Sequence, residues 1–411
     1  MDRRRFLTGA TALGCSAAAS PWITPVAMAA APWDTRLVVI ILRGGVDGLD
    51  VIQPYGDPHL AALRPGLPVG EAGGAFDLDG FYGLNPAFGA LKPLYDAGEF
   101  GAVHAVSTPY RSMRSHFDGQ DILEAGLPGL TGGGLRDGWL NRLLQTTPGL
   151  EPEIAYAIGP EQMLVLSGEA RAARWSPDAE LRISANARAL LNVVHHDDPL
   201  FRDASEDAIE IVEQIAAEAA AAEAAATGDG GEDGAEMMMM AGSTSRTSDT
   251  TALARFAASR LRRDTRIASF SVNGWDTHSR QGRIMGRRGQ ALADVLLTLK
   301  ADLGPVWDKT AVLCMTEFGR TAAENGSGGT DHGTGGALFY AGGALRGGQV
   351  MGDWPGLGPG DLFEGRDLLP TRDVRAYAAW AMRGLIGLET RVLERDIFPG
   401  LDMGAAPRLV L

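Results

Sequence analysis

The chain has 411 residues, of which 45% are hydrophobic and 55 are glycine, a composition typical of an α/β protein with many tight turns. This length suits one large α/β domain or two ordinary ones. The formal net charge is −14 with no block of lysine or arginine outside the N-terminus, so we expect no binding to nucleic acid.

Residues 1–31 have the features of an export signal. The segment from Asp2 to Thr8 (DRRRFLT) resembles the twin-arginine motif of bacteria, an Ala-rich stretch follows, and Ala27-Met28-Ala29 offers a cleavage site. We therefore expect export to the periplasm; the alternative is a basic N-terminus on a cytoplasmic protein. No other stretch approaches the ~20 apolar residues of a membrane span, so we expect no transmembrane segment in the mature chain. Cys314 would then be its single thiol.

The first half of the mature chain predicts buried strands separated by loops and helices. Leu37–Leu42 (LVVIIL) and Gly101–Val106 are short apolar runs typical of buried parallel strands. Pro54–Phe81 is rich in Gly, Pro and Asp and predicts a loop. Further predictions are helices at Asn85–Gly98 and Leu135–Leu144, a loop entering a helix over Arg111–Gly126, and minor strands at Ile154–Ile158 and Met163–Leu166.

Residues 204–251 differ sharply in composition from their surroundings. Glu206–Thr227 is an Ala/Glu segment of strong helix propensity, and Gly228–Thr251 is Gly, Asp, Ser and Thr around Met237–Met240. Such a segment buries too little apolar surface for a core of its own. We expect a helical and mobile insertion within a single domain spanning 32–411.

The second half returns to a strand and helix pattern. A helix is predicted at Thr251–Arg263, strands at Ile267–Val272 and Ala311–Met315 with an amphipathic helix between them, and a terminal helix at Arg372–Leu388. If both strands are parallel, the residues that follow them meet at one edge of the sheet, where open α/β sheets bind their ligands.

Acidic residues and histidines follow these strands. Asp276 and His278 come after the first, Glu317 comes after the second, and Asp331 and His332 follow a Gly/Ser-rich loop. Carboxylates and imidazoles that converge in this way are ligands for a divalent cation or an acid/base set. The mixture of oxygen and nitrogen suits zinc, manganese or iron.

Each of these residues also has a structural alternative. Asp276 could cap a helix and leave His278 exposed, and His332 could be a hydrogen-bonded loop histidine. Asp47, in the turn after the first strand, is a candidate ligand with an Asx turn as its alternative. These alternatives stay open on the sequence alone.

Five motifs in order carry a resemblance to a known family: LVVIILRGGVDGL, RSHFDGQDILEAG, GWDTH, TEFGR and NGSGGTDHGTGG. With them the chain resembles the bacterial family called domain of unknown function 1501, from about Leu37 to the C-terminus. That family looks like the alkaline phosphatase and sulfatase superfamily. The resemblance implies a three-layer α/β/α sandwich with a mostly parallel sheet, metal at the strand ends, and hydrolysis of phosphate or sulfate esters.

The resemblance also suggests roles for individual residues. The expected metal ligands are Asp47, Asp276, His278, Glu317, Asp331 and His332. The superfamily usually has Asp-His where this chain has Glu317-Phe318, so one imidazole is missing and a second metal is in doubt.

Ser115 is the candidate nucleophile, because a helix N-terminus offers N–H groups to an anion. Arg114 is expected beside it, with Arg111 and Arg320 holding the substrate's anionic oxygens. The alternative is that Ser115 caps the helix and that Arg111 and Arg114 are surface charges. The Cys/Ser-x-Pro-x-Arg signature is absent, which disfavours a formylglycine sulfatase.

Two functions follow as hypotheses. The first is a periplasmic metal-dependent hydrolase of a small phosphate or sulfate ester. The second is a non-catalytic exported protein that keeps the fold and binds a partner protein. The sequence names no substrate for either.

Overall fold

The computed structural model describes residues 31–111, 114–129, 137–177 and 250–411. Their main sheet consists of β1 (Arg36–Arg43), β5 (Phe100–Ser107), β6 (Ala155–Ile158), β7 (Ala173–Trp175), β8 (Ile267–Asn273), β9 (Thr310–Met315), β10 (Gly336–Ala341), β11 (Val350–Met351) and β12 (Arg372–Asp373). The strand order is β11-β5-β10-β9-β1-β8-β6-β7, with β12 beside β5. Only β10 runs antiparallel to its neighbours among these strands.

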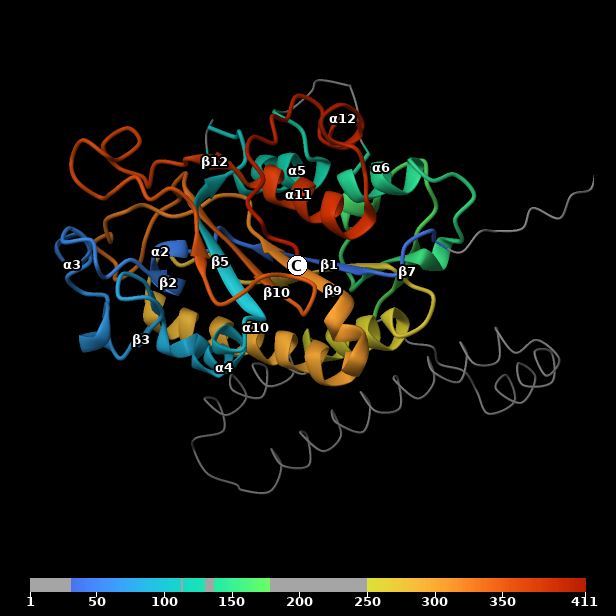
Figure 1. Ribbon diagram of the computed structural model, residues 1–411. Helices are drawn as coiled ribbons and strands as arrows, with labels where there is room; N and C mark the ends of the chain where they lie inside the picture. Colours follow the sequence, from blue (N-terminus) through green and yellow to red (C-terminus); the bar gives the residue numbers. More distant parts are fainter. Residues whose placement is uncertain (1–30, 112–113, 130–136, 178–249) are drawn as a thin grey trace, which may run out of the picture.

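Helices cover both faces of this sheet (Figure 1). On one face lie η2 (Pro86–Leu91), α4 (Lys92–Asp96), the helical residues 250–261 and α10 (Gln281–Leu303). On the other lie α5 (His116–Ala125), α6 (Trp139–Gln145), α11 (Val374–Ile386) and α12 (Thr390–Val392). The predicted α/β/α sandwich with a mostly parallel sheet is therefore confirmed.

The central strand β1 shows why its sequence is apolar at consecutive positions. Val38 packs into the core that contains Leu296 of α10, whereas Val39 packs into the core that contains Trp139 of α6. Successive side chains of a strand point to opposite faces, and here both faces are covered by helices. A strand in this position has no solvent face on which polar residues would alternate.

Smaller elements complete the fold. Those near the first strand are α2 (Gly48–Val51), β2 (Ile52–Gln53), α3 (Leu60–Leu63), η1 (Glu71–Gly73), β3 (Phe76–Asp77) and β4 (Gly83–Leu84), with β2, β4 and β3 forming a separate small sheet. Four short helical turns lie elsewhere: η3 (Pro152–Ile154), η4 (Leu164–Leu166), η5 (Gly304–Lys309) and η6 (Leu393–Ile397).

Most of the strand predictions are confirmed, and one is wrong. The runs Leu37–Leu42, Gly101–Val106, Ile154–Ile158, Ile267–Val272 and Ala311–Met315 lie in β1, β5, β6, β8 and β9. The predicted strand Met163–Leu166 is instead the turn η4, because Leu166 N bonds Met163 O and the Glu124 carboxylate accepts from Val165 N.

The predicted helices over Leu135–Leu144 and Arg372–Leu388 begin later in the structure, at α6 and α11. The segment Asn85–Gly98 divides into η2 and α4 rather than forming one helix. Pro93 explains the division, since it has no N–H to continue the hydrogen-bond ladder of the preceding turn.

The predicted export signal and the insertion at 204–251 lie outside the described residues, apart from Ala31 and residues 250–251. Within the described ranges, no helix is long and apolar enough to cross a membrane.

Candidate metal centre

The carboxyl ends of three neighbouring strands build one edge of the site. Arg43 at the end of β1 lies beside Asn273 of β8, and Ile41 lies beside Met315 of β9. The chain leaves β1 through Gly44, which has φ +121, and a Cβ there would lie 2.6 Å from the main-chain nitrogen of Asp276. Only glycine permits this approach of the two exit turns. Because β10 is antiparallel, it starts at this same edge.

Three of the predicted ligands meet at that edge. Nε2 of His278 lies 2.9 Å from Nε2 of His332. The Oδ1 atom of Asp276 lies 3.2 Å from the first of these nitrogens and 3.4 Å from the second. These side chains come from the loop after β8 and the loop before β10, so the sheet topology brings them together.

A fourth side chain, His116, joins them from the first position of α5. Its Nε2 lies 3.6 Å from Oδ2 of Asp276, and its ring centroid lies 4.3 Å from that of His332. One ligand atom from each of these three residues lies within 4.8 Å of the others, a spacing that a single metal ion can span. We call His116, Asp276, His278 and His332 the imidazole centre.

The other ring nitrogen, Nδ1, of each histidine faces an oxygen that can only accept a hydrogen bond. The contacts are His116 to Oε1 of Glu317 at 2.7 Å, His278 to Oδ1 of Asp331 at 3.0 Å, and His332 to the main-chain oxygen of Arg114 at 2.8 Å. The hydrogen of each neutral ring therefore belongs on Nδ1, and the lone pair belongs on Nε2. This is the usual arrangement of histidines that ligate metals.

Two observations show that the Nε2 side of the imidazole centre fits a cation. The lone pairs of His278 and His332 face one another at 2.9 Å, which is repulsive unless a metal ion or a shared proton lies between them. Nε2 of His116 is buried and has no hydrogen-bond partner among the described residues. A buried polar atom without a partner costs free energy, and a metal ion would remove that cost.

Glu317 holds His116 in place. Its carboxylate is fully buried and accepts from His116, from Gly44 N at 2.9 Å and from Nε2 of Gln120 at 3.1 Å. Burial alone would raise the pKa of Glu317, but these hydrogen bonds, above all that from His116, lower it. The same contact raises the pKa of His116. Glu317 thus contacts the Nδ1 side of the ring rather than the side that faces Asp276.

Asp276 is held by a guanidinium. Nη2 of Arg320 donates to its Oδ1 at 2.6 Å. Burial raises the pKa of Asp276, and the contact with Arg320 outweighs burial and lowers it. Nη2 also donates to the main-chain oxygens of Gly44 and Trp275, while Nε donates to that of Gly45 and Nη1 to that of Thr330. The predicted anion-binding residue is therefore committed to this chain's own oxygens.

The charges around the imidazoles do not balance. Three carboxylates, Asp276, Glu317 and Asp331, stand against the one guanidinium of Arg320. Hydrogen bonds from Asn325 and His278 lower the pKa of Asp331, so it stays ionised at neutral pH. Two negative charges remain, which one divalent cation would neutralise.

Asp47 lies in a different environment. Both of its oxygens bond Arg64, at 2.8 and 3.0 Å, and Nε2 of Gln281 donates to it at 2.7 Å. Asp47 and Arg64 are each 1% exposed. Asp47 also caps α2 by accepting from Asp50 N at 3.2 Å. We call Asp47, Asp50, Arg64 and Gln281 the Asp47–Arg64 cluster.

The predicted catalytic and anion-binding side chains at the start of α5 have structural partners. Ser115 is the N-cap of α5 and accepts from Asp118 N at 3.5 Å. The side chain of Arg114 pairs with Asp367 at 3.0 Å and with Glu364 at 3.3 Å. Arg111 donates to Ser107 at 2.8 Å and lies over the ring of Phe363.

Sequence reasoning missed His116, although it lies in the motif RSHFDGQDILEAG directly after the candidate nucleophile. Its partner Glu317 is 201 positions away, so no local pattern joins them. The available signal was a histidine at the N-terminus of a predicted helix, next to residues already considered catalytic.

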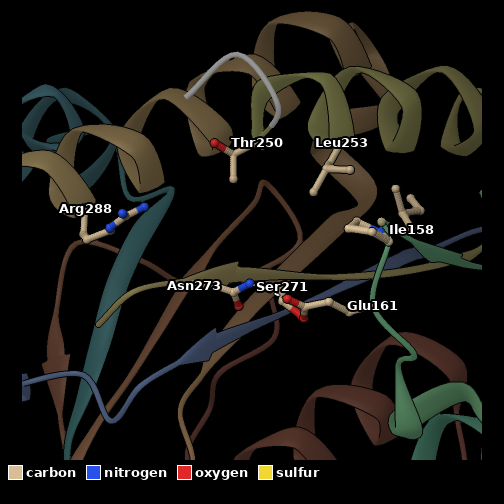
Figure 2. Close-up of a pocket in the computed structure, with 9 residues that line it drawn as sticks. Ile158, Glu161, Thr250, Leu253, Ser271, Asn273 and Arg288 are labelled. Atoms are coloured by element: carbon tan, nitrogen blue, oxygen red, sulfur yellow. Dashed lines mark hydrogen bonds between the residues drawn. The ribbon is translucent and has the colours of Figure 1, made fainter. Parts of the chain in front are cut away.

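One hollow is lined in part by the imidazole centre, and a second hollow shares two lining residues with the first. The first, of about 470 Å³, is lined among others by Gly44, His116, Gln120, Glu161, Asn273 and Asp276. The second, of about 170 Å³, is shown in Figure 2, and its lining includes Ile158, Glu161, Leu253, Ser271, Asn273 and Arg288. Glu161 and Asn273 line both. We call them the Asp276 hollow and the Leu253 pocket.

Two solved structures are similar to this one in chain path. A protein in the alkaline phosphatase superfamily from Vibrio parahaemolyticus has 13% identity, a TM-score of 0.41, and coverage of 93% of this chain and 75% of its own. The lipoteichoic acid synthase LtaP from Listeria monocytogenes has 8% identity, a TM-score of 0.38, and coverage of 91% and 77%. Both TM-scores are below 0.5, so nothing about the chemistry of this chain follows from either likeness.

At the level of sequence, no curated protein matches. The model of one protein family matches residues 99–395, which contain His116, Asp276, His278 and His332. Since this match spans well over half of the chain, the protein belongs to the family described as protein of unknown function DUF1501.

Proposed function

We propose that the imidazole centre binds one divalent metal ion and that the protein is a periplasmic metal-dependent hydrolase of phosphate or sulfate esters. One observation carries the metal site: three imidazoles and one carboxylate converge, and every Nδ1 is held by an acceptor while every Nε2 faces inward. The ester class comes from the resemblance of the motifs.

The ligand set is three ring nitrogens from His116, His278 and His332 and one oxygen from Asp276. Nitrogen and oxygen ligands in this ratio suit zinc, iron(II) or manganese better than calcium or copper(I). A divalent ion in this position supplies Lewis-acid activation of the ester and of water.

The chain's own residues hold the ligands in place. Glu317 and Asp331 fix the rings of His116 and His278, and Arg320 fixes the carboxylate of Asp276. Because the hydroxyl of Ser115 is the N-cap of α5, we assign the attack on the ester to water rather than to this serine. The Asp276 hollow leaves room beside Asp276 and His116 for the substrate.

The first test is metal content. Purified mature protein should carry close to one equivalent of metal by elemental analysis, whereas His116→Ala and His332→Ala should lose it. His59→Ala is the matched control. His59 is half exposed, and its contact is with Asp57, which is not part of the imidazole centre. Wild-type protein without stoichiometric metal, whose melting is unchanged by a chelator, would remove the proposal.

The second test is hydrolysis by the metal-loaded protein, with Asp276→Asn as the inactive variant. A second function, that of an exported binding protein without catalysis, is favoured by the capping role of Ser115, which leaves the predicted nucleophile occupied. Stoichiometric metal together with no turnover of phosphate or sulfate esters would put this second function first. Export is tested separately, since Arg3→Lys with Arg4→Lys should leave the precursor in the cytoplasm.

A further inference from the structure

We propose that the substrate is an ester with a single negative charge and an apolar group, and that this group lies in the Leu253 pocket. The inference rests on the proposed function and narrows it. It combines two independent observations, the charge balance around the imidazole centre and the two lining residues that the hollows share.

The first observation is the sum of the charges around the imidazole centre when a divalent ion is bound. Asp276, Glu317 and Asp331 outnumber Arg320 by two charges, and a divalent ion brings this group to neutrality. A doubly charged phosphate monoester would restore the full excess of negative charge in a half-buried site. A diester or a sulfate monoester brings one negative charge, so its electrostatic cost is smaller.

The residues that line the Asp276 hollow and the Leu253 pocket add no surplus of positive charge. Arg43, at the edge of the Asp276 hollow, pairs with Glu124 at 2.6 Å and with Glu161 at 3.1 Å. In the Leu253 pocket, Arg288 and Glu161 contribute opposite charges. Among the described lining residues, the cationic groups are thus matched by carboxylates, unlike a site built for a dianion.

The two residues shared by the hollows indicate where the rest of the substrate goes. Asn273 donates to Oε1 of Glu161, and Ser271 donates to Oε2 at 2.9 Å. Glu161 and Asn273 border both hollows: His116 and Asp276 also line the Asp276 hollow, and Leu253 and Ile158 also line the Leu253 pocket (Figure 2). A substrate whose reacting bond is at the imidazole centre would extend past this common border into the Leu253 pocket.

The size and lining of the pocket define the group. A dry cavity of roughly 150 Å³ lined by apolar side chains holds a benzene ring, and the Leu253 pocket measures about 170 Å³. Its apolar walls come from Ile158, Pro160 and Leu253. A phenyl or short branched alkyl group matches these walls in size, and polar side chains of Glu161, Thr250, Ser271, Asn273 and Arg288 line the remainder of the pocket.

The experiment uses unreactive phosphonates, so it measures binding without turnover. Calorimetry of the metal-loaded protein compares methyl benzylphosphonate and methyl methylphosphonate, both singly charged, with benzylphosphonate, which is doubly charged at mildly basic pH. We expect the first to bind about tenfold more tightly than either of the others. Equal binding of the two monoesters would overturn the pocket assignment, and tighter binding of the dianion would overturn the charge assignment.

Two variants locate the apolar group. Leu253→Phe fills the pocket and should abolish the advantage of benzyl over methyl, while Leu385→Phe, an equally buried leucine in α11, should leave it intact. If Leu253→Phe does not fold, Thr250→Phe replaces it. Thr250 is half buried and lines the same pocket, so this ring should also reduce the advantage of benzyl over methyl. An unchanged preference in the folded pocket variant would contradict the inference.

Failure of the proposed function has a different signature. A protein that takes up no metal fails at the elemental analysis, before any phosphonate is added. A protein that takes up metal, prefers methyl benzylphosphonate and hydrolyses nothing fails as a hydrolase but supports the pocket. A hydrolase whose phosphonate affinities show no preference supports the proposed function and overturns this inference.

Discussion

Two clusters of carboxylates lie near the carboxyl edge of the sheet, and they differ in how their charge is balanced. In the Asp47–Arg64 cluster, a guanidinium bonds both oxygens of Asp47 within a fully buried site. Around the imidazole centre, Asp276 is the one carboxylate of three that pairs with Arg320, so the charges of Glu317 and Asp331 are left. Similar acidic residues after β1 and β8 therefore have different consequences. Asp47 has its counter-charge within the chain, whereas the carboxylates around the imidazoles outnumber their one guanidinium.

Exposure separates the two clusters in the same way. The side chain of Asp47 is 1% exposed, whereas those of Asp276 and His278 are each 45% exposed. A buried and neutralised pair contributes to the uniqueness of the fold, and its loss is costly. The half-exposed side chains of Asp276 and His278 are accessible to an ion and to a substrate. We therefore assign a structural role to Asp47 and propose metal binding for Asp276, and four experiments test this distinction.

Arg64→Met should reduce the free energy of unfolding more than any other variant in these experiments, because it removes the guanidinium that pairs with Asp47. Asp47 would remain buried without its partner, next to Asp50, whose pKa is already raised by burial and then by the nearby charge of Asp47. We expect a loss of about 3–5 kcal/mol in the free energy of unfolding, measured with urea at neutral pH. Arg395→Met is the control, since its exposed pair with Asp396 should cost less than about 1 kcal/mol. Equal losses would contradict the distinction between the clusters.

The second experiment measures how the free energy of unfolding depends on pH through a buried histidine, His104. Burial lowers the pKa of His104 to about 4 from its ordinary value of 6.5. The unfolded chain binds a proton at a higher pH than the folded chain, so stability is full above pH 6.5 and is lost as pH falls toward 4. His104 should account for about 3 kcal/mol of this loss.

The measurement is urea unfolding at about pH 7.5 and about pH 4 in the presence of a chelator, for wild type and for His104→Phe. Because His104 stacks on Tyr82 and meets the edge of Trp354, an aromatic replacement keeps most of the packing. The variant should lose less stability on acidification than wild type. His59→Phe, at an exposed position, should lose as much stability on acidification as wild type. If His104→Phe also loses as much as wild type, His104 is not the source of the pH dependence.

The contrast between the clusters also shows what the sequence could predict. Continuous apolar runs such as LVVIIL identify β1, β8 and β9, and the rule for parallel sheets then places Asp276 and Glu317 at one edge. The α/β/α layers were implied by the resemblance of the motifs, and the order of the strands in the sheet was not predicted. The strand β10 was not predicted, because it begins at Gly336 in a glycine-rich loop and has no boundary in composition.

The part that sequence could not supply is the choice of partner for each charge. Arg64 lies in a segment predicted as loop, and its pairing with Asp47 depends on how that loop packs against Gln281 of α10. Glu317 looks like a metal ligand by its position after β9, but the ring of His116 from α5 lies against it. Such choices are made by contacts between segments far apart in sequence, which no local periodicity encodes.

The third experiment tests the role of Glu317. If this residue orients His116, then Glu317→Gln should lower metal affinity by about 10–100-fold, as removal of such supporting groups does. Competition with a chelator of known affinity measures it, and Glu324→Gln, whose carboxylate accepts from Gly66 N, is the control. If Glu317 were itself a ligand, the variant would lose metal as completely as His332→Ala. The size of the loss therefore separates the two roles.

Ser115→Ala should reduce stability the least of the four. It distinguishes a capping role of the Ser115 hydroxyl from a catalytic one. The serine is the N-cap of α5, whose first residue is His116, so its hydroxyl stabilises the helix that positions a ring of the imidazole centre. Loss of such a cap costs about 1 kcal/mol, while Ser115→Gly should cost only a few tenths. Both variants should retain metal and ester hydrolysis, because the Nδ1 contact of His116 is made by Glu317 rather than by Ser115. Ser115→Ala protein with normal stability and metal content but no turnover would instead identify this hydroxyl as the nucleophile, and water would then act only in a later step.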